Sequence, residues 1–178
     1  SSAMNQIKNN IDSDSIFNFP FRKVNIIYCG QSYTLLPSAF YDADKKENLL
    51  KFNQALIDED IVKSSLIKGT DIINIFSFPK IYFDFFQQKF PNAFIHHQAS
   101  LLVFDAVKKT DSSKQFHIDV YPDFFYATVV ENTHLLLSNT YSYTNLNEFV
   151  YHIINLCDKL ELNQQETKLY FSGEIEKE

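Results

Sequence analysis

The side chains of this chain that could bind a metal ion are above all five histidines, and their spacing disfavours a shared ion. His96 and His97 are adjacent, and because neighbouring side chains on a strand point to opposite faces, they cannot hold the same metal. His152 follows Glu148 by about one helical turn, but Lys159 lies on the same predicted face, which is typical of a solvated stripe. No third ligand accompanies that pair. The sequence therefore predicts no metal site.

A hydrolytic site needs a nucleophile beside a base, and the sequence offers no such pair. His117 and His134 are predicted on neighbouring strands of a meander, where polar side chains usually face water. Cys29 and Cys157 each lie in an apolar run at long spacing, which favours buried free thiols in a reducing compartment over a disulfide. A hydrolase that uses either histidine is therefore disfavoured, and no catalytic residue is predicted.

Phosphate binding by backbone amides needs closely spaced glycines, as in GxxxxGK or GxGxxG. This chain has only 3 glycines, Gly30, Gly69 and Gly173, and they are isolated. Asp119 and Asp123 form a pair of nearby carboxylates, but such pairs are usually turn and cap residues. The sequence therefore predicts no cofactor site.

Charge and hydropathy narrow the class of partner. Sixteen basic and 22 acidic residues give a net charge of -6 without a basic cluster, so we expect no nucleic-acid partner. No apolar stretch reaches the roughly 18 residues of a membrane span, and no signal-peptide pattern opens the chain, so we expect a cytoplasmic protein without a membrane partner. Ser1 to Ala3, before Met4, are interpreted as an expression scar.

The elements that would position these residues alternate between strands and helices in the first part of the chain. Residues 23–29 and 32–36 are predicted strands, joined as a hairpin at Gly30 and Gln31 because glycine accepts positive φ. Pro79 and Pro91 bound a helix that is apolar nearly all round, which favours burial between layers over a partner surface. The remaining predictions are a frayed helix or leader at 5–15, helices at 44–52 and 100–108, and strands at 61–67, 72–78 and 93–96.

The second part of the chain is predicted to be a three-strand meander, a helix and a last strand. The strands are residues 116–121, 125–130 and 135–141, and the last strand is 168–171. Asn145 and Glu148 form a capping box for a helix that ends near Leu160. Its apolar positions at helical spacing are Leu146, Phe149, Val150, Ile153, Cys157 and Leu160.

This order of meander, helix and strand resembles the opening of a ribonuclease H-like lobe, the unit duplicated in actin, sugar kinases and heat-shock chaperones. Ile118-Asp119-Val120-Tyr121 with Thr128-Val129-Val130-Glu131-Asn132 resembles their phosphate-holding strands, and also those of the pilus-assembly actin-like proteins. Tyr170-Phe171-Ser172-Gly173 resembles the strand that leads to the adenosine loop.

Further segments make the resemblance more specific. They are Tyr33-Thr34-Leu35-Leu36-Pro37-Ser38-Ala39-Phe40, Lys51-Phe52-Asn53, Phe78-Pro79-Lys80, Lys89-Phe90-Pro91-Asn92-Ala93 and Asp123-Phe124-Phe125. Together they are similar to an uncharacterised bacterial family with an actin-like ATPase fold and no assigned function. The resemblance implies a mixed α/β, ribonuclease H-related fold. It also implies further chain before Phe21 and after Gly173, so the sequence is interpreted as a fragment, a trimmed version or a divergent member.

The resemblance also indicates how the ATPase pattern has changed. An active member would carry a glycine two residues after Asp119 and a glycine-rich turn before the following helix, where this chain has Tyr121 and Tyr143. The ring of Tyr121, with Phe124 and Phe125 beside it, would occupy the phosphate space. The double glycine of the adenosine loop is reduced to Gly173.

We therefore expect a leader at residues 1–20, a divergent first α/β lobe at 21–110 and a truncated ribonuclease H-like lobe at 111–178, with Asp111 to Ser113 as the linker. The predicted function is a non-catalytic protein-interaction module on a degenerate actin-like fold, with a protein as the partner. An exposed aromatic patch from Phe83 or from residues 17–21 would be its surface. The alternative is a divergent ATP binder that uses Asp119 through a metal, in a polar cleft between Pro122-Asp123 and Gly173.

Overall fold

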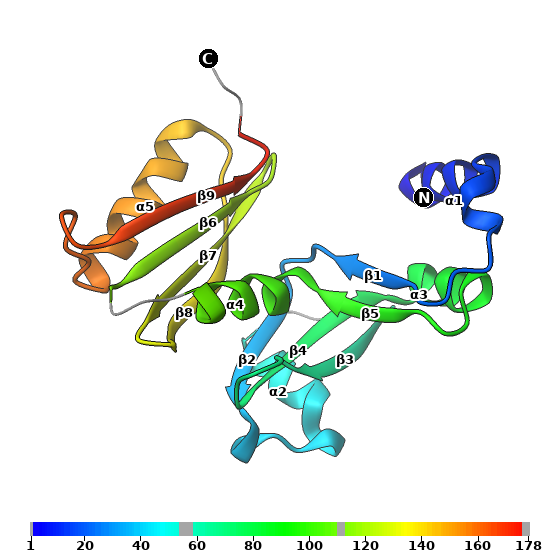
Figure 1. The fold of residues 1–178 in the computed structure, drawn as a ribbon, viewed down its shortest axis with the longest axis horizontal. Coiled ribbons are helices and arrows are strands. Elements are labelled where there is room, and N and C mark those ends of the chain that lie inside the picture. Colours follow the sequence, from blue (N-terminus) through cyan, green and yellow to red (C-terminus); the bar gives the residue numbers. More distant parts are fainter. Residues whose placement is uncertain (1, 54–58, 110–112, 176–178) are drawn as a thin grey trace.

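The computed structural model describes residues 2–53, 59–109 and 113–175 and has a mixed α/β architecture (Figure 1). Two of the three residues of the predicted linker, Asp111 and Ser112, lie outside the described residues. The elements up to the linker are α1 (Ser2–Ser13), η1 (Ser15–Asn18), β1 (Asn25–Tyr28), β2 (Tyr33–Pro37), η2 (Ser38–Phe40), η3 (Ala43–Lys45), α2 (Lys46–Asn53), β3 (Asp60–Leu66), β4 (Ile72–Pro79), α3 (Lys80–Lys89), β5 (Phe94–His97) and α4 (Gln98–Lys109).

Strand β4 organises the first part of the chain. It is apolar and buried along most of its length, and it pairs in antiparallel fashion with β2 on one side and β3 on the other. The predicted hairpin of β1 and β2 is wrong, because β1 instead pairs in parallel with β5. Gly30 lacks the positive φ of a hairpin turn, and its carbonyl accepts a hydrogen bond of 2.6 Å from Tyr126 Oη. The chain therefore crosses between two sheets at Gly30.

The N-terminal residues, predicted to be a frayed helix or leader, form helix α1, which packs on the rest of the chain. Met4 and Ile11 of α1 are buried. The ammonium of Lys8 lies 5.7 Å from the centre of the Phe85 ring, and Lys89 and Asp12 form an ion pair of 3.3 Å, so α1 lies against α3. Helix α3, for which burial was favoured over a partner surface, is partly buried: Tyr82, Phe83 and Phe86 pack against the core, but none of its residues is fully buried.

The second part of the chain forms one four-stranded sheet with the order β8-β7-β6-β9. Its elements are β6 (Gln115–Val120), β7 (Phe124–Glu131), β8 (His134–Ser142), α5 (Leu146–Lys159) and β9 (Lys168–Gly173). The predicted meander is confirmed, and Asn132 and Thr133 both have positive φ, as a tight two-residue turn between strands requires. Strand β9 returns parallel to β6 after the α5 crossover.

Helix α5 covers one face of this sheet, and four of its six apolar positions singled out in the sequence pack on the core. Its cap is as predicted, because Asn145 Oδ1 accepts the Glu148 amide at 3.1 Å. Leu156 is buried, whereas Leu146 is 72% exposed and Val150 is also exposed. The ring of His152, predicted to face water, packs against two aromatic rings of the sheet. The apolar positions packed on the core are Phe149, Ile153, Leu156, Cys157 and Leu160.

Helix α4 covers the other face of the sheet and joins the two parts of the molecule. It contacts β6, β7 and β8, and its Ser100 accepts a buried hydrogen bond of 2.8 Å from Asn74 of β4. One aromatic cluster spans both parts and contains Tyr33, Phe76, Phe78, Phe124 and Tyr126. None of the helices in the described ranges is long and apolar enough to cross a lipid bilayer.

Candidate functional site

The carboxyl ends of β6 and β9 meet at Asp119, the acidic residue that the sequence singled out. Its side chain is 6% exposed. Ser172 of β9 donates a hydrogen bond of 2.5 Å to Asp119 Oδ1, and Gln98 of α4 donates one of 3.0 Å to Oδ2. Both carboxylate oxygens are thus engaged by neutral donors, and Asp119 ties three elements together.

Tyr121 closes the end of β6 beside this carboxylate. Its ring stacks on Phe124, with ring centres 4.7 Å apart and planes 5° from parallel. Its hydroxyl donates to Cys29 Sγ at 3.2 Å, and Tyr143 Oη donates to its carbonyl oxygen. Burial, followed by the hydrogen bond to Cys29, raises the pKa of Tyr121, so the hydroxyl remains a donor at neutral pH.

The two phenylalanines that were predicted beside Tyr121 lie on different faces of the sheet. Phe124 lies beside Tyr121, but Phe125 points to the opposite face of the sheet, because neighbouring strand residues alternate. There Phe125 packs on Phe149 of α5. Cys29 also differs from its prediction, since it is exposed and not buried.

Gly173 is held against the end of β6 and has a φ of 88°. A Cβ at this position would overlap the carbonyl oxygen of Val120. The glycine is thus required by the close approach of two strands, and the Glu174 amide continues the ladder by donating to the same carbonyl at 2.9 Å.

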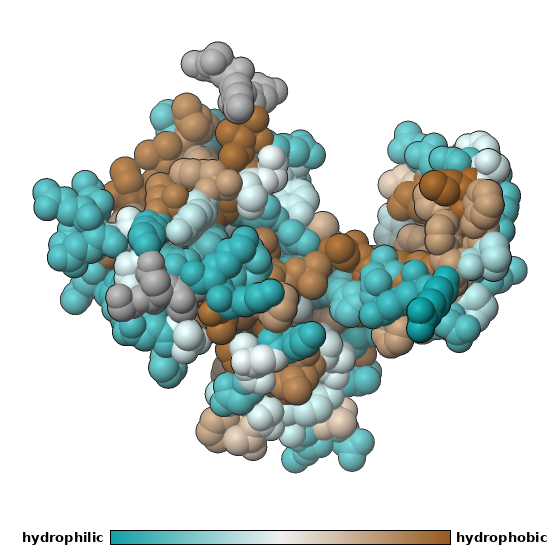
Figure 2. All heavy atoms as spheres, in the orientation of Figure 1, coloured by the Kyte–Doolittle hydropathy of each residue, from teal (hydrophilic) through white to brown (hydrophobic). Residues whose placement is uncertain are grey.

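On the α5 side of these strand ends lies a largely apolar hollow of about 280 Å³. Figure 2 shows hydrophobic residues gathered over α5 and β9. The lining residues are Val120, Tyr143, Asn145, Leu146, Phe149, Phe171, Glu174 and Ile175. The lining contains no cationic side chain, so the hollow suits an apolar group and not a phosphate. Sequence reasoning missed this hollow, because helical spacing groups Leu146 with the other apolar positions of α5 and does not show which of them the sheet covers.

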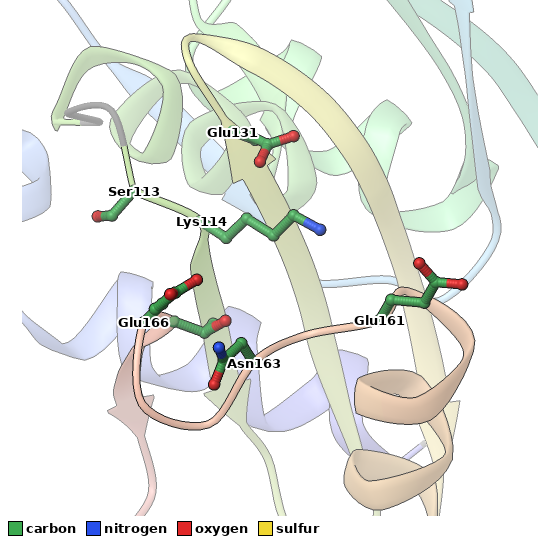
Figure 3. A pocket seen from close by; sticks show the side chains of 7 residues that line it. Ser113, Lys114, Glu131, Glu161, Asn163 and Glu166 are labelled. Carbon is green, nitrogen blue, oxygen red and sulfur yellow. The ribbon is translucent and has the colours of Figure 1, made fainter.

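A second pocket, of about 320 Å³, lies at the opposite ends of β6 and β9 and is polar (Figure 3). Lys114 extends its ammonium group between Glu131 and Glu161, and Glu166 lies across the pocket. Three carboxylates and one ammonium leave an excess of negative charge, which repels phosphate. Within the described part of the chain, no group of three His, Cys, Asp or Glu residues could hold a metal.

The structure separates the histidines as the sequence predicted for His96 and His97. His96 bonds Asn25 at 3.1 Å, whereas His97 is buried among aromatic rings on the other face. The amide of Ala99 donates to His97 Nδ1, so the proton lies on Nε2. Burial lowers the pKa of His97 to about 4, and His97 is therefore a neutral residue of the core.

His117 and His134 do not lie on neighbouring strands, because β7 separates β6 from β8. His117 stacks on Tyr170 of β9, with ring centres 4.6 Å apart, and accepts from or donates to Gln115 at 3.1 Å. His134 lies 2.8 Å from the Asn132 carbonyl in its own turn. Neither histidine is hydrogen-bonded to a serine or cysteine among these contacts.

A comparison with models of known protein families gives a match over this chain. The model of a family described as a protein of unknown function (DUF3822) matches residues 1–178. The chain belongs to the DUF3822 family. A comparison with curated proteins gives no significant match.

A solved structure supports the fold of this DUF3822 chain. The chain is similar to a Bacteroides thetaiotaomicron protein with an actin-like ATPase fold and unknown function, with a TM-score of 0.91 and 22% sequence identity. The match covers 97% of this chain and 68% of that one. The DUF3822 chain thus has an actin-like ATPase fold, and the predicted resemblance to an uncharacterised family with this fold is confirmed.

Proposed function

We propose that this DUF3822 protein is a non-catalytic protein-interaction module whose actin-like fold has lost its nucleotide site. The observation that supports the proposal is the closed end of β6. Both oxygens of Asp119 are occupied by Ser172 and Gln98, and Tyr121 and Phe124 fill the adjoining space.

A nucleotide would have to displace several interactions at this position. Mg²⁺ binds carboxylate oxygens, but those of Asp119 are already engaged, and each donor left without its acceptor would cost about 1–3 kcal/mol if it stayed buried. Phosphate oxygens need converging backbone amides, whereas the chain after Asp119 presents an aromatic stack. The two pockets nearest these strands provide an apolar lining and an excess of carboxylates.

The class of partner follows from charge and exposed apolar surface. A net charge of -6 disfavours nucleic acid and anionic lipid as partners, so we propose a protein partner, in the bacterial cytoplasm. Of the two predicted aromatic surfaces, Phe83 is partly covered by Lys63, whose ammonium lies 4.5 Å from the ring centre. Phe17, Phe19 and Phe21 are exposed, as are several apolar residues of α5 and β9.

Thermal unfolding with and without saturating Mg²⁺-ATP tests the loss of the nucleotide site. A ligand at about 100 times its Kd stabilises by about 2.7 kcal/mol, which corresponds to roughly 5–10 °C for a chain of this size. We expect no shift for the wild type and none for Asp119→Asn, which keeps the shape of the side chain and removes its charge. A shift of that size in the wild type that disappears in Asp119→Asn would overturn the proposal and identify Asp119 as a metal ligand.

A further inference from the structure

We infer that a basic pocket at the start of β1 and β5 binds carboxylate side chains of an acidic peptide in a partner protein. This inference rests on the proposed interaction module and specifies the chemistry of its partner. The pocket has a volume of about 220 Å³, and its walls are two internal segments, residues 19–24 and 89–93. The first segment leads from η1 into β1, and the second connects α3 to β5 (Figure 1).

The charge of the basic pocket is opposite to that of the whole chain. Its lining contains three cationic side chains, Arg22, Lys23 and Lys89, and no aspartate or glutamate. The chain as a whole has 16 basic and 22 acidic residues, so the pocket concentrates positive charge on an acidic protein. Such a local concentration attracts anionic groups and speeds their association.

Arg22 provides the group that is best suited to a carboxylate. It is the only arginine of the chain, and it is exposed. Within residues 2–53, 59–109 and 113–175, it forms no hydrogen bond or ion pair. A guanidinium presents a planar set of donors that fits both oxygens of one carboxylate. Arg22 can therefore bind a partner's carboxylate without first breaking a contact within this chain.

The two lysines add positive charge while they keep the contacts that they already make. The ammonium of Lys89 lies 3.3 Å from Asp12 Oδ1 and 3.4 Å from Asn18 Oδ1. Both distances exceed the roughly 2.7–2.9 Å of a strong hydrogen bond between an ammonium and a carboxylate. The ammonium of Lys23 lies 5.1 Å from the centre of the Phe94 ring, which positions the side chain without supplying an opposite charge.

Hydrogen bonds within and between the walls form the pocket before a ligand binds. The Phe21 amide donates to the Phe19 carbonyl at 2.9 Å within the first wall. Gln87 of α3 donates to a carbonyl of the second wall at 2.8 Å. The Phe94 amide donates to the Val24 carbonyl at 3.0 Å and so joins the two walls. A preformed pocket needs little ordering on binding, which leaves more of the interaction energy for affinity.

The size and the apolar part of the lining favour a peptide as the ligand. About 220 Å³ is less than the roughly 300–1,000 Å³ of pockets for drug-sized ligands, so the pocket suits a few side chains and not a whole nucleotide. Phe19, Phe21 and Phe90 contribute apolar surface beside the cations. Three cations are also fewer than the roughly 6–10 phosphate contacts of a typical DNA-binding protein. We therefore expect a segment in which acidic residues flank apolar ones.

A nuclear magnetic resonance titration tests the inference. Because the chain has one arginine, the Nε–Hε signal of Arg22 in a nitrogen-15-labelled sample is identified without further assignment. The probe is a peptide of alternating glutamate and leucine, and the control peptide has glutamine in place of each glutamate. We expect the glutamate peptide to shift the Arg22 signal until it saturates, and the glutamine peptide to leave it in place. An Arg22 signal that the glutamate peptide does not move, or that both peptides move equally, would overturn the inference.

Two substitutions distinguish the basic pocket from the general charge of the surface. Arg22→Gln should weaken binding of the fluorescein-labelled glutamate peptide about tenfold in fluorescence anisotropy, the scale of one charge-assisted hydrogen bond. Lys68→Gln removes an equal charge from an exposed position between β3 and β4, and should leave the affinity unchanged. Equal losses in the two variants would indicate non-specific attraction and contradict the assignment to this pocket.

A phosphoserine peptide of the same pattern distinguishes the two kinds of oxyanion. We expect it to bind no more tightly than the glutamate peptide, and clearly tighter binding would assign the pocket to a phosphorylated partner and refute the choice of carboxylate. The Mg²⁺-ATP measurement concerns Asp119 and not this pocket. Failure of the peptide to bind and failure of the proposed function are therefore distinguishable.

Discussion

Replacing two leucines of α5, one at a time, tests how this helix is oriented on its sheet. Leu156 is 4% exposed in the core of the sheet, whereas Leu146 is 72% exposed at the start of the helix. Leu156→Ala should lower the free energy of unfolding by about 2–5 kcal/mol through lost burial and a residual cavity. Leu146→Ala should change it by no more than about 0.5 kcal/mol. Since both changes remove the same atoms, their difference isolates the environment of each side chain.

The assay is thermal and urea unfolding followed by circular dichroism, at a protein concentration where light scattering shows a monomer. For a chain of this length, each kcal/mol shifts Tm by about 2–4 °C, so Leu156→Ala should lower Tm by roughly 5–15 °C and Leu146→Ala by less than about 2 °C. Equal destabilisation by the two variants would refute the orientation of α5.

Three further changes probe the strand ends and the core. Gly173→Ala should destabilise by several kcal/mol, on the order of 2–4, because a Cβ overlaps the Val120 carbonyl and φ is 88°; urea unfolding measures it. Tyr126→Phe leaves the buried Gly30 carbonyl without its donor, so unfolding free energy should fall by about 1–3 kcal/mol in the same assay. The pKa of His97 lies at about 4 in the folded chain, below its ordinary 6.5. As the pH falls, the unfolded chain therefore takes up a proton before the folded chain does. Stability should therefore fall by about 3 kcal/mol as the pH drops from 6.5 to 4, and urea unfolding of His97→Gln should show a weaker pH dependence.

Local patterns predicted the C-terminal sheet well. The meander depends on short connections with turn-forming residues, and the start of α5 depends on the Asn145 and Glu148 cap, so residues close in sequence determine both. The parallel return of β9 follows from the α5 crossover. The family resemblance contributed the identity of the fold.

Non-local pairing accounts for the main errors. The partner of β1 is β5, about 70 residues away, and nothing in residues 23–36 distinguishes that pairing from a hairpin. Helix α5 is apolar over a wide arc, and helical spacing cannot tell which flank of such an arc is covered. For this reason the pattern grouped Leu146 and Val150, which are exposed, with the core positions, and it placed His152, which packs on Tyr141, on a solvated stripe.

In the candidate site, too, sequence reasoning predicted what depends on neighbouring residues and missed what depends on distant ones. The position of Tyr121 at the end of β6, with Phe124 close by, follows from the strand and the residue order. The hydrogen bonds of Asp119 could not be predicted, because both donors are distant in the sequence. Gln98 lies in a helix 21 residues before Asp119, and Ser172 lies in a strand 53 residues after it. A carboxylate that looks available in the sequence is therefore already used.

Strand β9 contributes side chains to both faces of the C-terminal sheet. Ser172 points to the α4 face and bonds Asp119, while Phe171 points to the α5 face and lines the apolar hollow. A shift of one residue in the pairing with β6 would exchange these two faces, placing an aromatic ring against the carboxylate and a hydroxyl in the hollow. Gly173 opposes that shift, because only a residue without a Cβ can approach the Val120 carbonyl so closely. The same register thus engages Asp119 on one face and lines the apolar hollow on the other.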